Sequence, residues 1–383
     1  MAALDETLVH PGQHAATRPG ATRPGAVEPG ITEAGAYHRR HAPRGAAVPT
    51  FMAFALAVGV IAIQFIMVTT YAWSATSTAP RNVPVAIAGP SRAVALVTGE
   101  LNTARPGAFR LLPVSTAAKA RQDITSRQTY GAILVSGPGR IDVLVASGGS
   151  PAVASVLTAM AAKMDGVSTR PANVTDIVPT TAADPTGAAF SFTLLPLMLS
   201  SLIAGVVLTM RVPDPSRRAA ALVAFGIGGG LVSAAVAHTW LGVIPGHFTA
   251  IAGAMGLASL AAAAGVSGLA HFGARFGKRH VGLGAGSVII MLLGNPFSGM
   301  SSAPEMLPGI WGFIGQCLPT GAAATLLRSV GYFDGVRSGG PWTVLAVWAG
   351  AGLLLTLTAH RPIGGRSSSD PSFSASSPAV LPS

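Results

Sequence analysis

The chain has few residues that could carry redox or metal chemistry. Its 383 residues include one cysteine, Cys317, which excludes a disulfide within the chain and any cluster that needs several cysteine ligands. Charged residues make up only 10% of the sequence, whereas hydrophobic residues make up 50%. This balance is typical of a polytopic membrane protein and not of a soluble globular domain.

Acidic residues are especially scarce, so the formal net charge is +11. In a soluble chain such an excess would favour a nucleic-acid partner. Here much of the basic charge lies in the terminal tails and in short loops beside apolar segments, so orientation in a membrane explains it better. We therefore expect contact with membrane lipid and no nucleic-acid partner.

A nucleotide-binding motif is also missing. A P-loop has the pattern Gly-x-x-x-x-Gly-Lys-Ser/Thr, in which the hydroxyl binds magnesium. The nearest stretch, Gly273–Arg279, has the wrong spacing and no hydroxyl residue after its lysine. We expect no enzymatic activity, no cofactor and no metal site, and ATP-driven transport would need a separate ATP-binding subunit.

The long apolar segments contain no Asp, Glu, Lys or Arg except at their ends. Ion-coupled transporters usually place such groups near the middle of the membrane. His238 is the one titratable residue well inside a segment, and we expect it to be a hydrogen-bonded packing residue. These absences disfavour a secondary transporter.

Histidine is absent from residues 74–188, which differ from the rest of the chain in their ordinary charge content. Serines there lack a nearby base, so no hydrolase site is expected. Strand and helix patterns alternate in this stretch and predict one compact α/β domain. The expected strands are Val83–Gly89, Ala108–Pro113, Tyr130–Val135, Ile141–Ala146 and Asn173–Val178, with a turn at 137–139; the expected helices are Ser91–Leu101, Thr116–Arg127 and one that starts at Pro151 after Ser150.

Six segments are apolar and long enough to cross a bilayer, which takes about 20 residues. They are Phe51–Trp73, Ala189–Met210, Ala219–Ile244, Thr249–Phe272, Val281–Met300 and Trp342–His360. Gln64 is the only strongly polar residue inside the first segment. We expect it to bond to a neighbouring helix or, as the alternative, to line a pathway.

The charges of the loops predict the orientation. Arg211, Arg217 and Arg218 follow the second span, and basic residues also follow the fourth and the sixth, whereas the loop at 245–247 has none. The positive-inside rule then places both termini in the cytoplasm and the α/β domain outside. The predicted organisation is a disordered basic tail at 1–48, a first helix at 49–73, the external domain at 74–188, five helices within 189–360 and a disordered tail at 361–383.

The fifth span is interrupted at Gly294-Asn295-Pro296, because proline removes a backbone donor and clashes with the preceding turn. Lipid tolerates the freed polar groups only where protein or a water-filled cavity satisfies them. Two interpretations remain for residues 301–335: an interfacial or re-entrant segment over a pathway, or a tightly packed outer loop. In the first, the candidate gate residues are Gln64, Asn295, Pro296, Ser298 and Glu305. Glu305 would face water or pair with Arg328.

The same region carries a family resemblance. Its residues are Gly294-Asn-Pro-Phe-Ser-Gly299, Pro304-Glu-Met-Leu-Pro308, Gly315-Gln316, Leu318-Pro319, Gly321-Ala322 and Tyr332-Phe-Asp-Gly335. They resemble the last third of bacterial ABC-2 type permeases, in the branch related to phage-infection proteins. Residues 85–87, 130–135 and 143–147 resemble the external domain of that branch.

The resemblance implies the permease subunit of an ABC-type exporter in the bacterial plasma membrane. Such a subunit pairs with a second permease, identical or different, and with a separate ATP-binding subunit. Arg211, Arg217 and Arg218 would contact that subunit, and the cargo would be lipid-, peptide- or drug-like. The loop from Arg211 to Arg218 is short for this contact. The alternative is a non-transporting scaffold, secretion accessory or phage-receptor-like surface protein.

Overall fold

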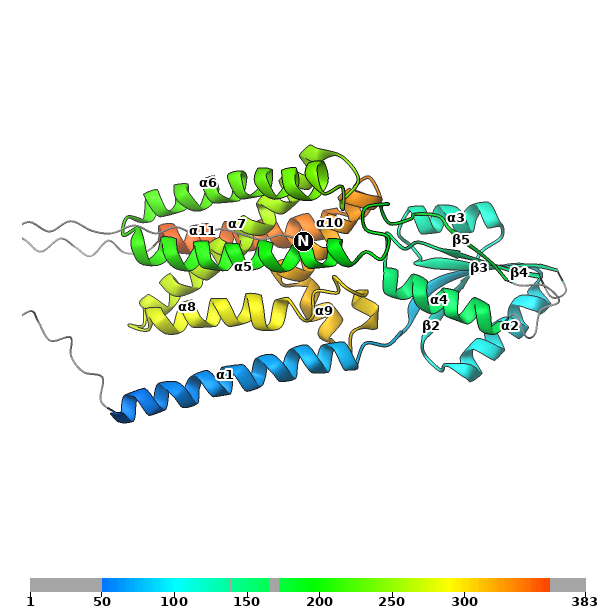
Figure 1. Ribbon diagram of the computed structural model, residues 1–383, viewed down its shortest axis with the longest axis horizontal. Coiled ribbons are helices and arrows are strands. Elements are labelled where there is room, and N and C mark those ends of the chain that lie inside the picture. Colours follow the sequence, from blue (N-terminus) through cyan, green and yellow to red (C-terminus); the bar gives the residue numbers. More distant parts are fainter. Residues whose placement is uncertain (1–49, 138–139, 165–171, 359–383) are drawn as a thin grey trace, which may run out of the picture. The chain divides into compact units, whose positions relative to one another are not determined.

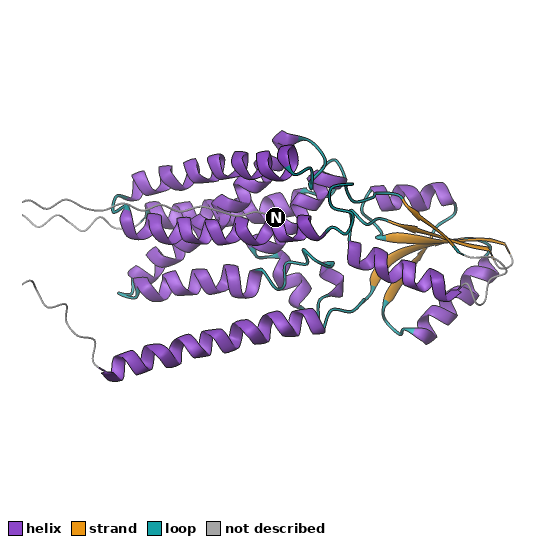
Figure 2. Cartoon of the chain, viewed as in Figure 1, coloured by secondary structure: helices purple, strands orange, loops and turns teal. Residues whose placement is uncertain are grey.

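The computed structural model describes residues 50–137, 140–164 and 172–358 (Figures 1 and 2). Both predicted tails and residues 138–139 of the predicted turn lie outside this part. The chain divides into two units, Met1–Leu56 and Ala57–Ser383. Of the first, only the opening turns of helix α1 are described.

The protein is mostly helical, and five of the described helices are apolar and long enough to cross a membrane. They are α1 (Thr50–Thr76), α5 (Ala188–Arg211), α6 (Pro215–Ala234) with its π-helical extension Ala235–Trp240, α7 (Phe248–Ala274) and α11 (Gly339–Leu357). This architecture is that of a polytopic membrane protein with a small α/β region.

The fifth expected span is shorter than predicted. Helix α8 (Arg279–Ser287) continues as a π-helical stretch, Val288–Gly294, and the whole falls below 18 residues. The helix ends at Gly294 because Asn295-Pro296 follows it, and the predicted continuation to Met300 is a turn and loop. The expected span Val281–Met300 is therefore not one continuous helix.

The helices outside the α/β domain, α1 and those within residues 188–357, form the helical half of the chain. Helix α7 is at its centre, where α5, α6, α8, α10 (Pro319–Tyr332) and α11 all pack against it. Two thirds of its most apolar window, 67%, is buried, against 0% for α1. Small residues make this possible: a Cβ added at Gly230 of α6 would lie only 2.5 Å from the Cα of Gly256 in α7. Such close backbone approach is how helices pack when lipid provides no hydrophobic driving force.

The α/β domain contains one five-stranded sheet in the order β2-β1-β3-β4-β5. The strands are β1 (Val83–Ala88), β2 (Phe109–Pro113), β3 (Gly131–Gly137), β4 (Arg140–Val145) and β5 (Asn173–Asp176). All pairs are parallel except β3 with β4. The predicted strands and helices of this region are thereby confirmed, with small shifts at their ends.

Helices cover both faces of the sheet (Figure 1). Val83, Val85 and Ile87 of β1 pack with α2 (Ser91–Ala104) and α4 (Pro151–Met164), whereas Ala86 and Ala88 pack with α3 (Ala117–Thr125). Successive side chains of a strand point to opposite faces, so a central strand buried on both sides must be apolar throughout.

Candidate functional site

The interruption after Gly294 is closed by the end of α1. The side-chain amide of Asn295 donates a hydrogen bond of 2.9 Å to the hydroxyl of Tyr71. The hydroxyl of Ser74 donates one of 2.7 Å to the carbonyl oxygen of Pro296. Polar groups that a broken helix frees inside a bilayer need partners of this kind. The break is thus joined to the α1 end nearest the α/β domain.

The segment after the break is hydrogen-bonded to the two helices that follow it. The hydroxyl of Ser298, which is 3% exposed, donates to the carbonyl oxygen of Asn295 at 2.8 Å. Gln316, in α9 (Trp311–Gln316), donates its amide to the carbonyl oxygen of Ser298 at 3.1 Å. The hydroxyl of Thr320 in α10 donates to the carbonyl oxygen of Ile290 at 3.1 Å. Of the predicted gate residues, Asn295, Pro296 and Ser298 therefore lie together in one network.

The chain then turns back along the other helices. The indole nitrogen of Trp348, midway along α11, donates to the carbonyl oxygen of Cys317 at 2.9 Å, so the start of α10 is level with the middle of α11. At the other end of α10, the carbonyl oxygen of Val330 lies against Gly246, just before α7. Every residue of α10 except Thr325 and Tyr332 is buried. This helix is packed within the bundle.

An aromatic cluster covers the break. The ring of Phe297 stacks on that of Trp311, with centroids 4.5 Å apart, and Trp73 of α1 meets both rings edge-on. Phe297 is fully buried. Offset-stacked and edge-to-face pairs add stabilisation beyond the area they bury. The cluster therefore holds α1, the break and α9 together.

The loop between the break and α9 enters the core of the α/β domain. Ala303 and Met306 are buried among the same residues as Val83 and Val85 of β1. The backbone N–H of Ala79 donates to the carbonyl oxygen of Met306 at 3.0 Å, and the guanidinium of Arg81 donates to the same oxygen at 2.7 Å. The helical half thus supplies part of the domain's hydrophobic core.

Glu305 binds the α/β domain and not Arg328. Its carboxylate accepts a hydrogen bond of 2.8 Å from the hydroxyl of Tyr130. Burial, followed by the charge of Glu305 and this hydrogen bond, raises the pKa of Tyr130 well above its ordinary value of 10.0. The predicted pairing of Glu305 with Arg328 is wrong, because the Arg328 guanidinium donates to the carbonyl oxygen of Met300 at 2.7 Å and lies over the ring of Phe190.

Arg127 makes a second contact between the α/β domain and the helices. Its guanidinium donates to the carbonyl oxygen of Thr325 at 3.2 Å, contacts the hydroxyl of Ser329 and lies 5.2 Å from the ring centroid of Phe333. Burial lowers the pKa of Arg127, while Tyr130 and Glu305 act in the opposite direction. Sequence reasoning missed Arg127, since nothing in the local pattern distinguishes it from a surface arginine.

The three arginines predicted to contact an ATP-binding subunit differ in exposure. Arg211 and Arg217 are exposed, but Arg218 is only 2% exposed. Its guanidinium donates to the carbonyl oxygens of Val212 and Pro213 and contacts His271, so it holds the loop from inside. The expectation that Arg218 contacts a partner is wrong, because burial removes its guanidinium from the surface.

Two other predicted residues lie apart from the break. Gln64 is exposed on α1, and no hydrogen bond joins it to Asn295 or to another residue in the described part of the chain. His238 is in the π-helical end of α6, where its Nδ1 donates to the carbonyl oxygen of Ile244 at 2.9 Å. Its prediction as a hydrogen-bonded packing residue is confirmed.

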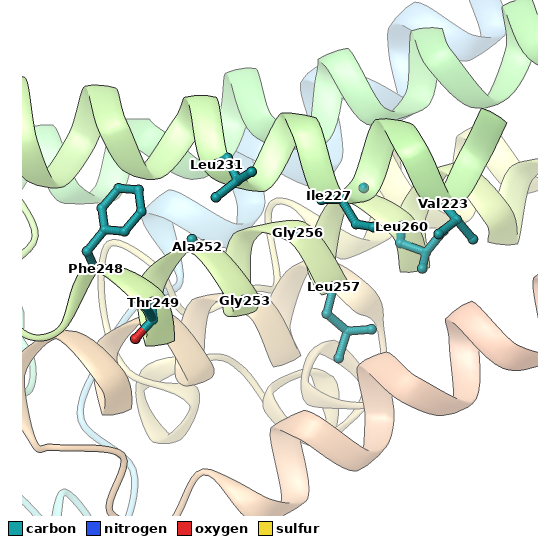
Figure 3. Close-up of a pocket in the computed structure, with 11 residues that line it drawn as sticks. Val223, Ile227, Leu231, Phe248, Thr249, Ala252, Gly253, Gly256, Leu257 and Leu260 are labelled. Carbon is teal, nitrogen blue, oxygen red and sulfur yellow. The ribbon is translucent and has the colours of Figure 1, made fainter. Parts of the chain in front are cut away.

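An apolar groove of about 360 Å³ lies between α6 and α7 (Figure 3). Val223, Ile227 and Leu231 of α6 line it together with Leu257 and Leu260 of α7. The groove is separate from the interruption at Gly294 and contains no titratable side chain, so it offers shape and apolar surface but no chemistry.

Within the described residues, no three His, Cys, Asp or Glu side chains gather where they could hold a metal ion. The arrangement around Gly294 is instead a hydrogen-bonded junction between α1, the interrupted helix, α10 and the α/β domain. Comparison with protein-family models, with curated proteins and with solved structures found no match to this chain.

Proposed function

We propose that this chain is the permease subunit of an ABC-type exporter in a bacterial plasma membrane. The main support is the helix that is interrupted after Gly294. The chain that follows it runs back along α11, and its loop at Ala303–Met306 enters the core of the α/β domain. The resemblance of residues 294–335 to ABC-2 permeases points the same way. The subunit would export a lipid-, peptide- or drug-like molecule and would pair with a second permease, identical or different.

In this proposal residues 301–335 form a re-entrant segment between the membrane-spanning helices and the external domain, and the break at Asn295 leads into it. Its movable part is held by the hydrogen bonds of Asn295, Ser298 and Gln316. These bonds exchange when the helices shift, and the loop at Ala303–Met306 transmits the shift to the α/β domain. Interrupted helices serve transport in other membrane proteins because their freed backbone groups line a cavity in one of the states.

The energy source is a separate ATP-binding subunit on the cytoplasmic side. Arg211 and Arg217, both exposed, are the contact residues, and Arg218 positions the loop between them from inside. The loop is short, so the contact also draws on the basic tail before α1. Both termini are cytoplasmic and the α/β domain is external.

Affinity purification from the native bacterium tests this function. The full chain in mild detergent should bring down a protein with a P-loop, and the pair should hydrolyse ATP in nanodiscs while the permease alone does not. Arg211→Glu with Arg217→Glu should weaken the association about tenfold, which corresponds to ~1.4 kcal/mol. Lys278→Glu, an exposed change in a different loop, is the matched control.

A non-transporting scaffold is the second candidate, and one observation favours it. The polar side chains at the break find partners inside the chain, as a static junction also requires. A scaffold would bind no P-loop protein in several detergents, and the Arg211→Glu, Arg217→Glu variant would behave like wild type. That result would overturn the exporter.

A further inference from the structure

The α/β domain has a groove on its surface that is lined only by residues of α2 and α4 and by Arg105 directly after α2, and none of the contacts with the helical half described above lies in it. It lies between α2 and α4, on the sheet face opposite α3, and has a volume of about 390 Å³. Small residues of the two helices, Ala104, Ser155 and Ala159, leave it open. This volume is within the range of roughly 300–1,000 Å³ that small-molecule sites occupy.

The lining is apolar at the base and charged at the rim. Leu101, Val156 and Met160 line the base, whereas Arg105 and Lys163 are exposed cations at its edge. Within the described chain, neither cation has an acidic partner or a side-chain hydrogen bond. Glu100 is the single carboxylate in the lining, so the groove carries an excess of positive charge.

A second hollow continues the apolar surface along α2. It shares Glu100 and Ala104 with the first and extends over Gly99 to Leu96, whose side chain is 63% exposed. From Leu96 to Arg105 the helix rises roughly 14 Å at 1.5 Å per residue. The two hollows form an elongated, mainly apolar track along α2, with Glu100 and Thr103 also in its lining, and the track ends at a cation.

Placement at helix ends offers a simpler explanation for the two cations alone. Arg105 follows the last residue of α2 and Lys163 is in the last turn of α4, where positive charge complements the helix dipole. A cation that only complements a helix dipole needs no groove beside it, however. The dipole also does not explain why Leu96 is exposed along the same line. The combination of cationic rim and apolar track indicates a ligand with both properties.

We propose that the α2–α4 groove binds a single-chain anionic lipid, such as a long-chain fatty acid. The acyl chain lies along Leu96, Leu101 and Met160, and the anionic head group meets Arg105 and Lys163. Burial of apolar surface supplies most of the affinity and the two cations select an anion. The site is independent of the exporter proposal, since a scaffold with this domain would bind the same ligand.

The test uses the full chain in nanodiscs with a diazirine-labelled oleate and an uncharged diazirine-labelled oleyl alcohol. After illumination, mass spectrometry compares label on peptides of α2 and α4 with label on α3. Oleate should label α2 and α4, and the alcohol should label them about tenfold less, equivalent to ~1.4 kcal/mol. Equal labelling by both probes would overturn the anionic preference.

Two variants examine the groove itself. Ala104→Trp fills the wall shared by both hollows, and Arg105→Glu with Lys163→Glu reverses the rim; each should remove most of the oleate label from α2 and α4. Ala118→Trp and Arg121→Glu on the exposed side of α3 are matched controls and should leave it unchanged. Circular dichroism checks that each variant is folded. If Ala104→Trp misfolds, the double variant of Arg105 and Lys163 still tests the groove, because both of its positions are exposed.

Other occupants give different results. A second copy or a peptide in the groove would exclude the probe and leave α2 and α4 with no more lipid label than α3. Labelling that neither groove variant reduces would mean nonspecific contact with the bilayer. Either result would overturn the proposal.

Discussion

Tyr130 of the α/β domain donates a 2.8 Å hydrogen bond to the carboxylate of Glu305 in the helical half. The two residues are 175 positions apart in the chain. Their contact lies beside Met306, which is buried in the core of the domain. A shift of the loop that contains Glu305 and Met306 must therefore disturb both the helical bundle and the domain.

Met306→Ala should loosen the α/β domain. Truncation of a buried methionine costs about 2–5 kcal/mol, through lost burial and the cavity that remains. Hydrogen exchange of the β1 amides should become faster by the corresponding factor, because β1 packs against this side chain. Phe313→Ala, a larger truncation at an exposed site on α9, should leave β1 exchange unchanged.

Tyr130→Phe removes the hydrogen bond to Glu305 and should lower the free energy of unfolding by about 1–2 kcal/mol. This is near the low end of the range for a hydrogen bond to a charged group, because the site is only partly buried. The pKa of Tyr130 is raised in the folded state, so its contribution is complete below the ordinary value of 10.0 and is lost only as pH rises through the folded pKa. The difference in unfolding free energy between wild type and variant should be constant from neutral pH to about pH 9. A difference that disappears within that window would contradict the assignment.

Asn295→Leu with Pro296→Ala should convert the break into continuous helix. Insertion should be unaffected, because apolar substitutions ease it. If the chain is the proposed exporter, ATP-dependent export measured at matched expression should fail, since the movable element is lost. Normal export would show that the break is a packing feature only. Tyr71→Phe is a milder change, because it removes only the hydroxyl that accepts the hydrogen bond of Asn295. It should lower the free energy of unfolding by about 0.5–1.5 kcal/mol.

Arg218→Ala should destabilise the N-terminal end of α6, whereas Arg217→Ala should not. The buried guanidinium of Arg218 donates to two loop carbonyls, and hydrogen bonds to charged groups contribute about 1.5–3 kcal/mol each. Thermal unfolding in detergent measures the difference. Equal effects of the two substitutions would contradict the inward orientation of Arg218.

Cysteine labelling tests the orientation in intact cells. In a Cys317→Ser background, a cysteine at Arg140 should react with a membrane-impermeant maleimide, and one at Arg217 should react only after permeabilisation. Both positions are exposed, so accessibility reports the side of the membrane and not burial. Labelling of position 217 in intact cells would reverse the topology.

Local sequence pattern was sufficient for the α/β domain and for most of the apolar helices. Alternation and capping residues predicted the elements of the sheet, as at Thr116, whose hydroxyl accepts from the N–H of Lys119 at the start of α3. Length and hydropathy predicted six membrane-spanning helices, of which five are long enough to cross a membrane, and Asn295-Pro296 predicted the end of the π-helical stretch that follows α8. These features depend on neighbours within a few residues, so the sequence by itself determines them.

Tertiary structure decided which distant residues meet. Arg218 looked like a surface cation and is buried, Glu305 meets Tyr130 and not Arg328, and Met306 belongs to the core of a domain more than a hundred residues earlier in the chain. Charge and spacing alone do not distinguish these outcomes, because each depends on how the chain returns after the break. A buried polar group takes the partner that packing brings within hydrogen-bond distance, and only the folded chain determines that partner.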